Sequence, residues 1–334
     1  MINNKNNIKF YFNIINDSYV KAPLNETFIT FKTIDNFIFL VYSSKNSLIN
    51  CYDLIKLQKI CEIKEESVKT SRYVNFKHYL DKKNKRDLVI SIFCICDNIK
   101  MWNVKNWECI LNIININNSP DLGYVCFLND NNEIYIITSF RNNKYESRPI
   151  KAFDFNGKKI KEINDSKEAS LYIDSYYDNF LFKNYIISSN LNHVRSYNFN
   201  KNELFHEYSD TKDKEFYCYT MIYSINKEIK LFSSCYDGTI RIFNFLSGVL
   251  LKKIKINQIL FRIELWNKNY LFVGCGDNKI RIINIKDELI ISELSGHKNS
   301  VVDIKKIILP FYGECIISQG KNYDKIILWI LDNK

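Results

Sequence analysis

Several features that mark particular protein classes are scarce in this chain of 334 residues. Only 9 glycines and 4 prolines are present, so asparagine and aspartate must supply many of its turns. No stretch reaches the roughly 18 apolar residues of a membrane-spanning helix. The first residues, Met-Ile-Asn-Asn-Lys-Asn-Asn, contain no apolar signal core. We therefore expect no membrane span and no secretory signal.

Metal and disulfide signatures are also missing. The 10 cysteines have no regular framework spacing, and several lie inside apolar, strand-like runs. Cys94 and Cys96 face the same way on a strand, but no second cysteine pair or nearby histidine completes a zinc set. Free cysteines of this kind behave as small buried apolar residues, which fits a reducing compartment. We expect the cytoplasm or the nucleus, with no metal and no cofactor.

What is present is the composition of a globular β protein. Hydrophobic residues make up 46% and charged residues 25% of the chain, which excludes general disorder. The 22 tyrosines and 23 phenylalanines favour strands because they pack well on a pleated surface. The formal net charge is +10, but most of the excess is scattered lysine. The densest basic run, at 82–86, is interpreted as a solvated loop.

One pattern recurs along the chain: a polar turn, a short apolar strand ending in an aromatic residue or isoleucine, and then usually Asp or Asn. The clearest copies run from Asp237 to Asn244 and from Asp277 to Asn284. The anchor residues that end the strands are Tyr52, Trp102, Phe153, Tyr197, Phe243, Ile283 and Trp329. They lie 40 to 51 residues apart, close to the length of a four-stranded propeller blade.

A second landmark supports the repeat. An apolar or aromatic residue follows each of the first six anchors by 10 or 11 positions, at Ile63, Ile113, Ile163, Tyr208, Ile254 and Leu294. Two independent landmarks with the same period indicate seven copies of one unit. The predicted fold is therefore all-β: a seven-bladed β-propeller with four-stranded antiparallel blades, forming a single domain over 1–334.

The anchors followed by Asp or Asn resemble the Trp-Asp pair of the WD40 family, and Gly296-His297 is similar to the family's Gly-His pair. The resemblance covers nearly the whole chain, although Asn replaces Asp in four copies and Ile330 does so in the last. It implies a buried structural network of His297, Asp324 and Trp329. It also implies a role in binding other proteins.

The seventh copy ends soon after Trp329, so the last blade lacks its outer strand. An apolar stretch at about 8–15 offers a spare one. We expect this N-terminal strand to pair with the strand that contains Trp329 and to close the ring, since an unpaired edge would expose backbone donors and acceptors.

Catalytic signatures are not found. The four histidines, His78, His193, His206 and His297, fall in different parts of different blades, with no nucleophile at a catalytic spacing. Gly274-Cys275-Gly276 is half of a nucleotide-binding fingerprint, but a strand and a turn surround it rather than the start of a helix. We therefore predict that the chain is not an enzyme.

The predicted function is a protein-interaction scaffold, a monomeric propeller within a larger complex. Arginine and tyrosine in the loops at one face of the ring are the candidate partner-binding residues because both are frequent in interface hot spots. These candidates are Arg72, Arg141, Tyr145, Arg148, Tyr236, Phe261, Arg262 and Tyr323. Two alternatives remain open: a basic propeller that binds nucleic acid or anionic lipid, and a substrate receptor of a ubiquitin ligase. Arg195, Arg241 and Arg281 occupy equivalent strand positions and are interpreted as structural.

Overall fold

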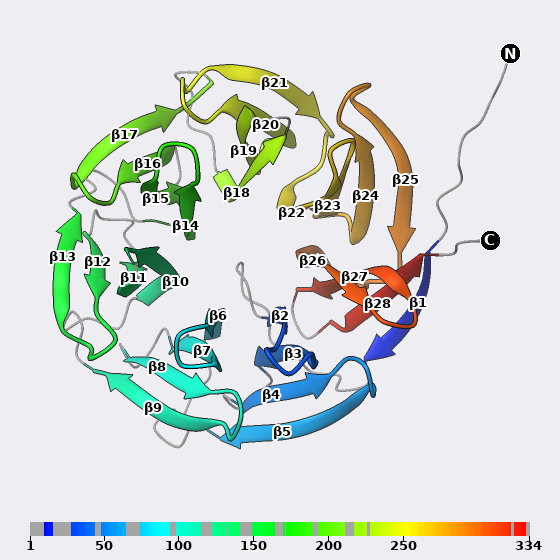
Figure 1. The fold of residues 1–334 in the computed structure, drawn as a ribbon. Coiled ribbons are helices and arrows are strands. Elements are labelled where there is room, and N and C mark those ends of the chain that lie inside the picture. The colour runs from blue at the N-terminus through cyan, green and yellow to red at the C-terminus, as the bar shows by residue number, and fades with distance from the viewer. Residues whose placement is uncertain are drawn as a thin grey trace, which may run out of the picture.

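The computed structural model describes residues 10–15, 28–43, 48–64, 74–93, 98–114, 122–131, 133–140, 149–163, 170, 172–189, 193–210, 217–225, 228–321 and 324–331. Within these residues the regular elements are all strands, and they form seven four-stranded antiparallel sheets. The sheets stand around a central axis as the blades of a propeller (Figure 1). The predicted fold class is therefore confirmed.

Each blade is named by its place in the chain, and its strands are given from the axis outwards. Blade 1 contains β2 (Phe28–Lys32), β3 (Ile38–Ser43), β4 (Leu48–Asp53) and β5 (Gln58–Lys64). Blade 2 contains β6 (Val74–Asp81), β7 (Arg86–Phe93), β8 (Asn98–Asn103) and β9 (Glu108–Ile113). Blade 3 contains β10 (Leu122–Asp130), β11 (Glu133–Phe140), β12 (Ile150–Phe153) and β13 (Lys159–Ile163). Blade 4 contains β14 (Tyr172–Asp178), β15 (Lys183–Ser189), β16 (Val194–Asn198) and β17 (Glu203–Tyr208).

The remaining blades follow the same plan. Blade 5 contains β18 (Tyr217–Ile225), β19 (Glu228–Cys235), β20 (Thr239–Asn244) and β21 (Leu250–Lys255). Blade 6 contains β22 (Leu260–Asn267), β23 (Tyr270–Cys275), β24 (Lys279–Asn284) and β25 (Leu289–Ser295). Blade 7 contains β26 (Val301–Leu309), β27 (Gly313–Gly320), β28 (Ile326–Leu331) and, from the other end of the chain, β1 (Phe10–Ile15).

The ring closes through the N-terminal strand, as predicted. Strand β1 pairs antiparallel with β28, from Phe10 opposite Leu331 to Ile15 opposite Ile326 (Figure 1). Residues 8 and 9, which were predicted to belong to this strand, lie outside the described residues. The pairing gives β28 an outer neighbour, so its backbone donors and acceptors on that edge are not left unpaired.

Every anchor residue lies in the third strand of its blade, and the second landmark lies in the fourth strand. The pairing of third and fourth strands shifts register just before the anchor in six blades, for example between Met101 and Trp102 and between Ile242 and Phe243. Such a bulge places two residues of one strand opposite one of the other. The bulge gives these six blades the same local geometry at the anchor, whereas β1 pairs with β28 without a register shift.

The Asp or Asn after the anchor shapes the following turn. Asn103 Oδ1 accepts the backbone N–H of Lys105 at 3.1 Å, and Asn284 Oδ1 accepts that of Lys286 at 2.9 Å. Either residue type can make this contact, which explains why Asn replaces Asp freely. In blade 7, β1 supplies the fourth strand, and Ile330, which follows the anchor, lies inside β28.

The blades pack through apolar side chains. Phe272 and Ile280 of blade 6 share one cluster with Val301, Ile304 and Trp329 of blade 7. A Cβ atom on Gly274 would lie 2.5 Å from the carbonyl oxygen of Val301. The glycine of the apparent nucleotide fingerprint therefore permits close approach of two blades.

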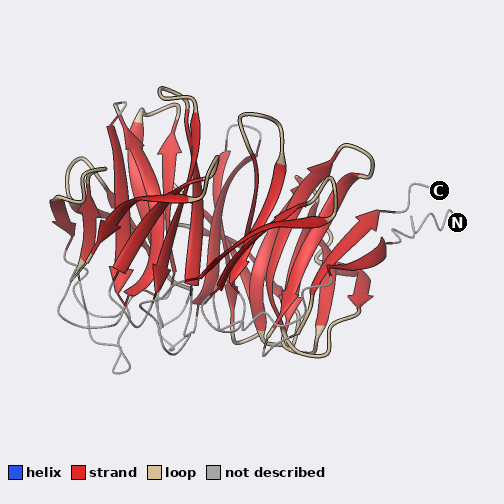
Figure 2. Ribbon diagram, turned by 90° about the horizontal axis from the view of Figure 1, so that it is seen from below, coloured by secondary structure: helices blue, strands red, loops and turns tan. Residues whose placement is uncertain are grey.

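The antiparallel order gives the ring two faces, seen from the side in Figure 2. The hairpin face carries the turns between first and second strands and between third and fourth strands. The loop face carries the connections between second and third strands and those between blades. The candidate partner-binding residues were predicted for the loop face.

Candidate functional site

Five of the eight candidate partner-binding residues lie outside the described residues: Arg72, Arg141, Tyr145, Arg148 and Tyr323. Tyr236 and Phe261 are described and lie together at the loop-face end of blades 5 and 6. Their rings meet edge to face, with centroids 5.7 Å apart at 77°. Val302 of blade 7 completes the cluster. Phe261 belongs to strand β22 rather than to a loop, and it is buried beside the half-buried Tyr236.

Arg262 is also part of strand β22, where only 2% of it is exposed. Its guanidinium carbon lies 3.7 Å from the centroid of the Tyr219 ring, and its Nε lies 3.5 Å from Asp303 Oδ1. Burial raises the pKa of Asp303 to about 7, although the positive charge of Arg262 opposes the shift. The loop position assumed for Arg262 is thus wrong, because its side chain joins the inner strands of three blades.

Two further charged residues meet on the inner strands. Lys77 Nζ of blade 2 lies 3.3 Å from Asp174 Oδ2 of blade 4, and the Tyr172 hydroxyl donates to the same oxygen at 2.8 Å. A pocket of about 220 Å³ lies between β14 and β18, with Asp174 and Thr220 among its lining residues. The Thr220 hydroxyl is buried and has no hydrogen-bond partner within the described residues. The inner wall therefore combines paired charges with small polar groups.

The structure brings His297, Asp324 and Trp329 together through a fourth residue, Ser318. The Trp329 indole N–H donates to Ser318 Oγ at 2.7 Å, and the same oxygen lies 2.7 Å from His297 Nε2. His297 Nδ1 lies 3.1 Å from Asp324 Oδ2. With the Nδ1–H tautomer, each group donates to the next, from Trp329 through Ser318 and His297 to Asp324.

Asp324 remains charged within this buried network. Burial favours the neutral acid, but the hydrogen bonds from His297 and from the backbone of Lys325 and Asn299 lower its pKa to about 2. Asp324 Oδ2 also accepts the backbone N–H of Lys298 at 2.7 Å. The carboxylate thereby ties the segment before β26 to the turn before β28.

Ser318 is the residue that sequence reasoning missed. A repeat-wide comparison could have found it, because Ser91 precedes Trp102 by the same 11 positions by which Ser318 precedes Trp329. The Trp102 indole N–H donates to Ser91 Oγ at 2.9 Å. Each of the two tryptophan anchors therefore donates to a serine at the equivalent position of its own blade. In blade 7, His297 and Asp324 extend this hydrogen-bond network.

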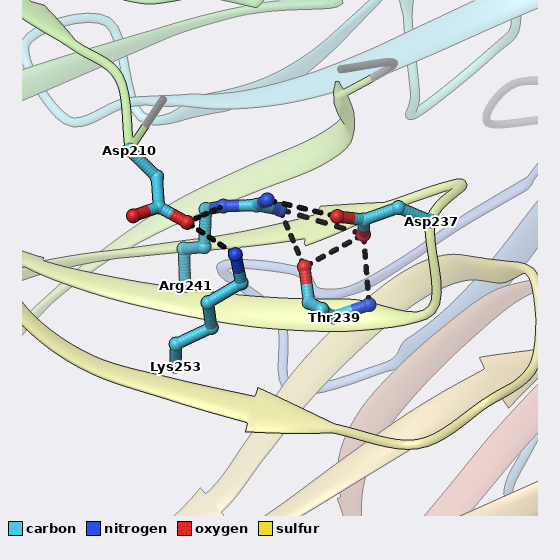
Figure 3. A network of polar contacts seen from close by, with 5 residues as sticks. All are labelled: Asp210, Asp237, Thr239, Arg241 and Lys253. Carbon is cyan, nitrogen blue, oxygen red and sulfur yellow. Dashed lines mark hydrogen bonds and ion pairs between the residues drawn. The ribbon is translucent and has the colours of Figure 1, made fainter. Parts of the chain in front are cut away.

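The arginines at equivalent strand positions form ion pairs, which agrees with a structural role. Fully buried Arg241 lies 2.8 Å from Asp237 Oδ2 through Nη2 and 3.2 Å from Asp210 Oδ2 through Nε (Figure 3). Lys253 and Thr239 complete the network. The hydrogen bond from Lys253 helps to lower the pKa of Asp210. Likewise, Arg281 pairs with Asp277 and Glu293, and Arg195 with Glu207.

No family model matches this chain, and no curated protein is similar to it in sequence. Across the described ranges, no group of three or more Cys, His, Asp and Glu side chains could hold a metal ion. None of the described segments forms a helix long and apolar enough to cross a membrane.

Proposed function

We propose that this chain is a WD40-type propeller that binds other proteins and holds them in a complex, without catalysing a reaction. The β-propeller architecture is compatible with such a scaffold. Closure by β1 and β28 pairs the last blade into the ring and supports a rigid scaffold. A preorganised surface loses little conformational entropy on binding, which favours a scaffold.

The observation that carries this proposal is the aromatic cluster of Tyr236, Phe261 and Val302 at the loop-face end of the ring. Tyr236 is half-buried, and its ring packs edge to face against Phe261. A rigid aromatic residue of this kind gives a large contact area at low entropic cost, which is typical of an interface anchor.

Affinity capture from native extract tests the proposal. The tagged full-length chain is compared with Tyr236→Ala and with Tyr223→Ala, at moderate and high salt and with and without nuclease. Tyr223 is a matched control because it is an exposed tyrosine of the same blade near the hairpin face. One or a few stoichiometric proteins that survive salt and nuclease, and are lost only from Tyr236→Ala, would support the scaffold.

Two other results would favour a different function. Captured material that disappears with salt or nuclease would favour a nucleic-acid binder, in which the net charge of +10 does the binding. Recovery of cullin ubiquitin-ligase subunits would favour a substrate receptor. Equal capture by all three proteins would exclude the aromatic cluster as the anchor.

A further inference from the structure

Large apolar side chains project from the hairpin face at the tips of the first hairpins of three blades. In blade 7, Phe311 is 81% exposed and Ile308 is 65% exposed. In blade 4, Phe182 is 79% exposed, and Phe180 is also exposed. Phe37 is exposed at the corresponding tip of blade 1. Exposed apolar groups gathered on one face mark a binding surface.

The local structure holds these side chains outward. In blade 4, buried Asp178 Oδ1 accepts the backbone N–H groups of Phe180 at 2.8 Å and Leu181 at 3.2 Å. Phe182 has a φ of 52°, a left-handed conformation that is unfavourable for a bulky residue. The equivalent residue in blade 1 is Asn36, which tolerates this conformation better. Phe182 thus keeps a bulky apolar side chain in water at a turn position where a small or polar residue fits more easily.

A basic tip lies beside the apolar tip of blade 1. Three exposed lysines project from the first hairpin of blade 2: Lys82, Lys83 and Lys85. Arg86 of the same hairpin is neutralised by buried Asp81, with Nε 2.9 Å from Oδ2. The backbone N–H of Ile34 donates to Asp87 Oδ2 at 2.8 Å, which fixes the blade 1 tip against blade 2. The apolar tip of blade 1 and the basic tip of blade 2 are therefore neighbours, and the three lysines form no ion pair within the described residues.

The neighbouring carboxylates leave this positive charge in place. Glu314, at the blade 7 tip, is paired with Lys306 and accepts the indole N–H of Trp266. Asp35 is the exposed acidic residue of the blade 1 tip, where Lys32 is also exposed. The first hairpins of blades 1 and 2 together carry the exposed lysines Lys32, Lys82, Lys83 and Lys85 against the exposed Asp35, beside the apolar tip of blade 1.

We infer that the hairpin face binds a lipid bilayer containing anionic lipids, with the apolar tips entering the headgroup region and the blade 2 lysines contacting the lipid charges. Blade 4 lies across the ring from blades 7 and 1 (Figure 1), so one partner can reach all three apolar tips only if it is broad and flat. Protruding aromatic residues beside lysines suit a bilayer, which accepts apolar groups below a negatively charged surface. The loop face then points away from the bilayer and remains open to proteins.

Sedimentation with vesicles tests this binding mode. The full-length chain should partition onto phosphatidylcholine–phosphatidylserine vesicles and much less onto phosphatidylcholine alone. The triple variant Lys82→Asn, Lys83→Asn, Lys85→Asn should lower the partition coefficient about a hundredfold, since each lysine near an anionic surface contributes about fivefold. Phe311→Ser and Phe182→Ser should each lower it roughly tenfold.

A matched pair of isoleucines provides the control. Ile308 lies on the hairpin face and Ile114, 57% exposed, lies at the loop-face end of β9. Ile308→Ser should weaken vesicle binding, whereas Ile114→Ser should leave it unchanged. Equal binding by both variants, or no preference of the wild type for anionic vesicles, would overturn the inference. A protein partner lost from extract on Phe311→Ser, without vesicle binding by the wild type, would make this face a protein interface instead.

Insertion is measured separately with Phe311→Trp. Its additional fluorescence should shift to shorter wavelength when anionic vesicles are added, because the indole leaves water. A spectrum unchanged at saturating vesicle concentration would mean that the tip does not enter the bilayer. These vesicle assays require no protein partner, so their failure leaves the scaffold proposal standing.

Discussion

Replacing Ser318 with alanine removes the centre of the hydrogen-bond network in blade 7. Ser318 Oγ accepts from the Trp329 indole at 2.7 Å and lies 2.7 Å from His297 Nε2, and all three side chains are buried. Each lost buried hydrogen bond costs about 1–2 kcal/mol, because the remaining group has exchanged water for a contact that is now missing. The two lost bonds should lower the free energy of unfolding by about 2–4 kcal/mol.

Ser91→Ala is the matched control, since Ser91 accepts the Trp102 indole N–H at 2.9 Å but has no histidine partner among the described residues. It removes one bond rather than two, so we expect a loss of about 1–2 kcal/mol. At the unfolding entropy typical of a chain of this length, the melting temperature should fall by about 3–6 °C for Ser318→Ala and about 1–3 °C for Ser91→Ala.

Urea titration followed by circular dichroism, with a thermal scan of each variant, measures the difference. The urea midpoint should decrease without a change in slope if the native state is otherwise unaltered. Equal midpoints for Ser318→Ala and Ser91→Ala would refute the reasoning, because the histidine contact would then contribute no stability. A Ser318→Ala variant as stable as the wild type would mean that the network does not stabilise the fold.

Three other perturbations give distinct signatures. Deleting residues 1–16 removes β1 and leaves β28 as an open edge, so we expect a sharply lower melting temperature and aggregation in light scattering; a truncated chain that melts with the full-length one would contradict closure. The pKa of Asp324 is about 2, below its ordinary value of 3.8, so its stabilising contribution is present above about pH 4 and is lost as the pH falls towards 2. Asp324→Asn should therefore reduce the fall of the urea midpoint between about pH 4 and pH 2. An equally large fall in this variant would exclude Asp324 as its cause. Arg241→Leu leaves the carboxylates of Asp237 and Asp210 without their buried partner and should destabilise the fold by about 3 kcal/mol in urea titration, whereas a neutral result would mean that leucine packing offsets the lost ion pairs.

The repeat could be predicted from sequence because each blade carries its own local signal. An anchor such as Trp102 or Phe243 lies next to the last residue of a strand that has buried side chains on both faces, and the polar turn after it marks where the strand must stop. Counting anchors gives the number of blades, and the missing outer strand of the last copy predicts the pairing of β1 with β28. These conclusions require only strand periodicity and the need to pair every edge.

The left-handed positions of the turns could not be predicted by residue type. Leu57, Trp107 and Glu288 each lie five residues after an anchor and have φ between 51° and 61°. A comparable turn of blade 5 has Gly248 at this place. The bulge and the Asx contact fix the backbone of the turn, so the blade imposes the conformation on residues that do not prefer it.

Contacts between blades were decided by the tertiary structure alone. The sequence predicted His297, Asp324 and Trp329 as one network, but Ser318 joins it only because β27 pairs with β28 in the observed register. Arg262 was assigned to an exposed loop, yet the inner strands of blades 5 and 7 bring Tyr219 and Asp303 against it. A local pattern determines which residues form a strand and which face is apolar. The packing of seven twisted sheets around one axis decides which side chains from distant repeats meet and which hairpin tips remain exposed.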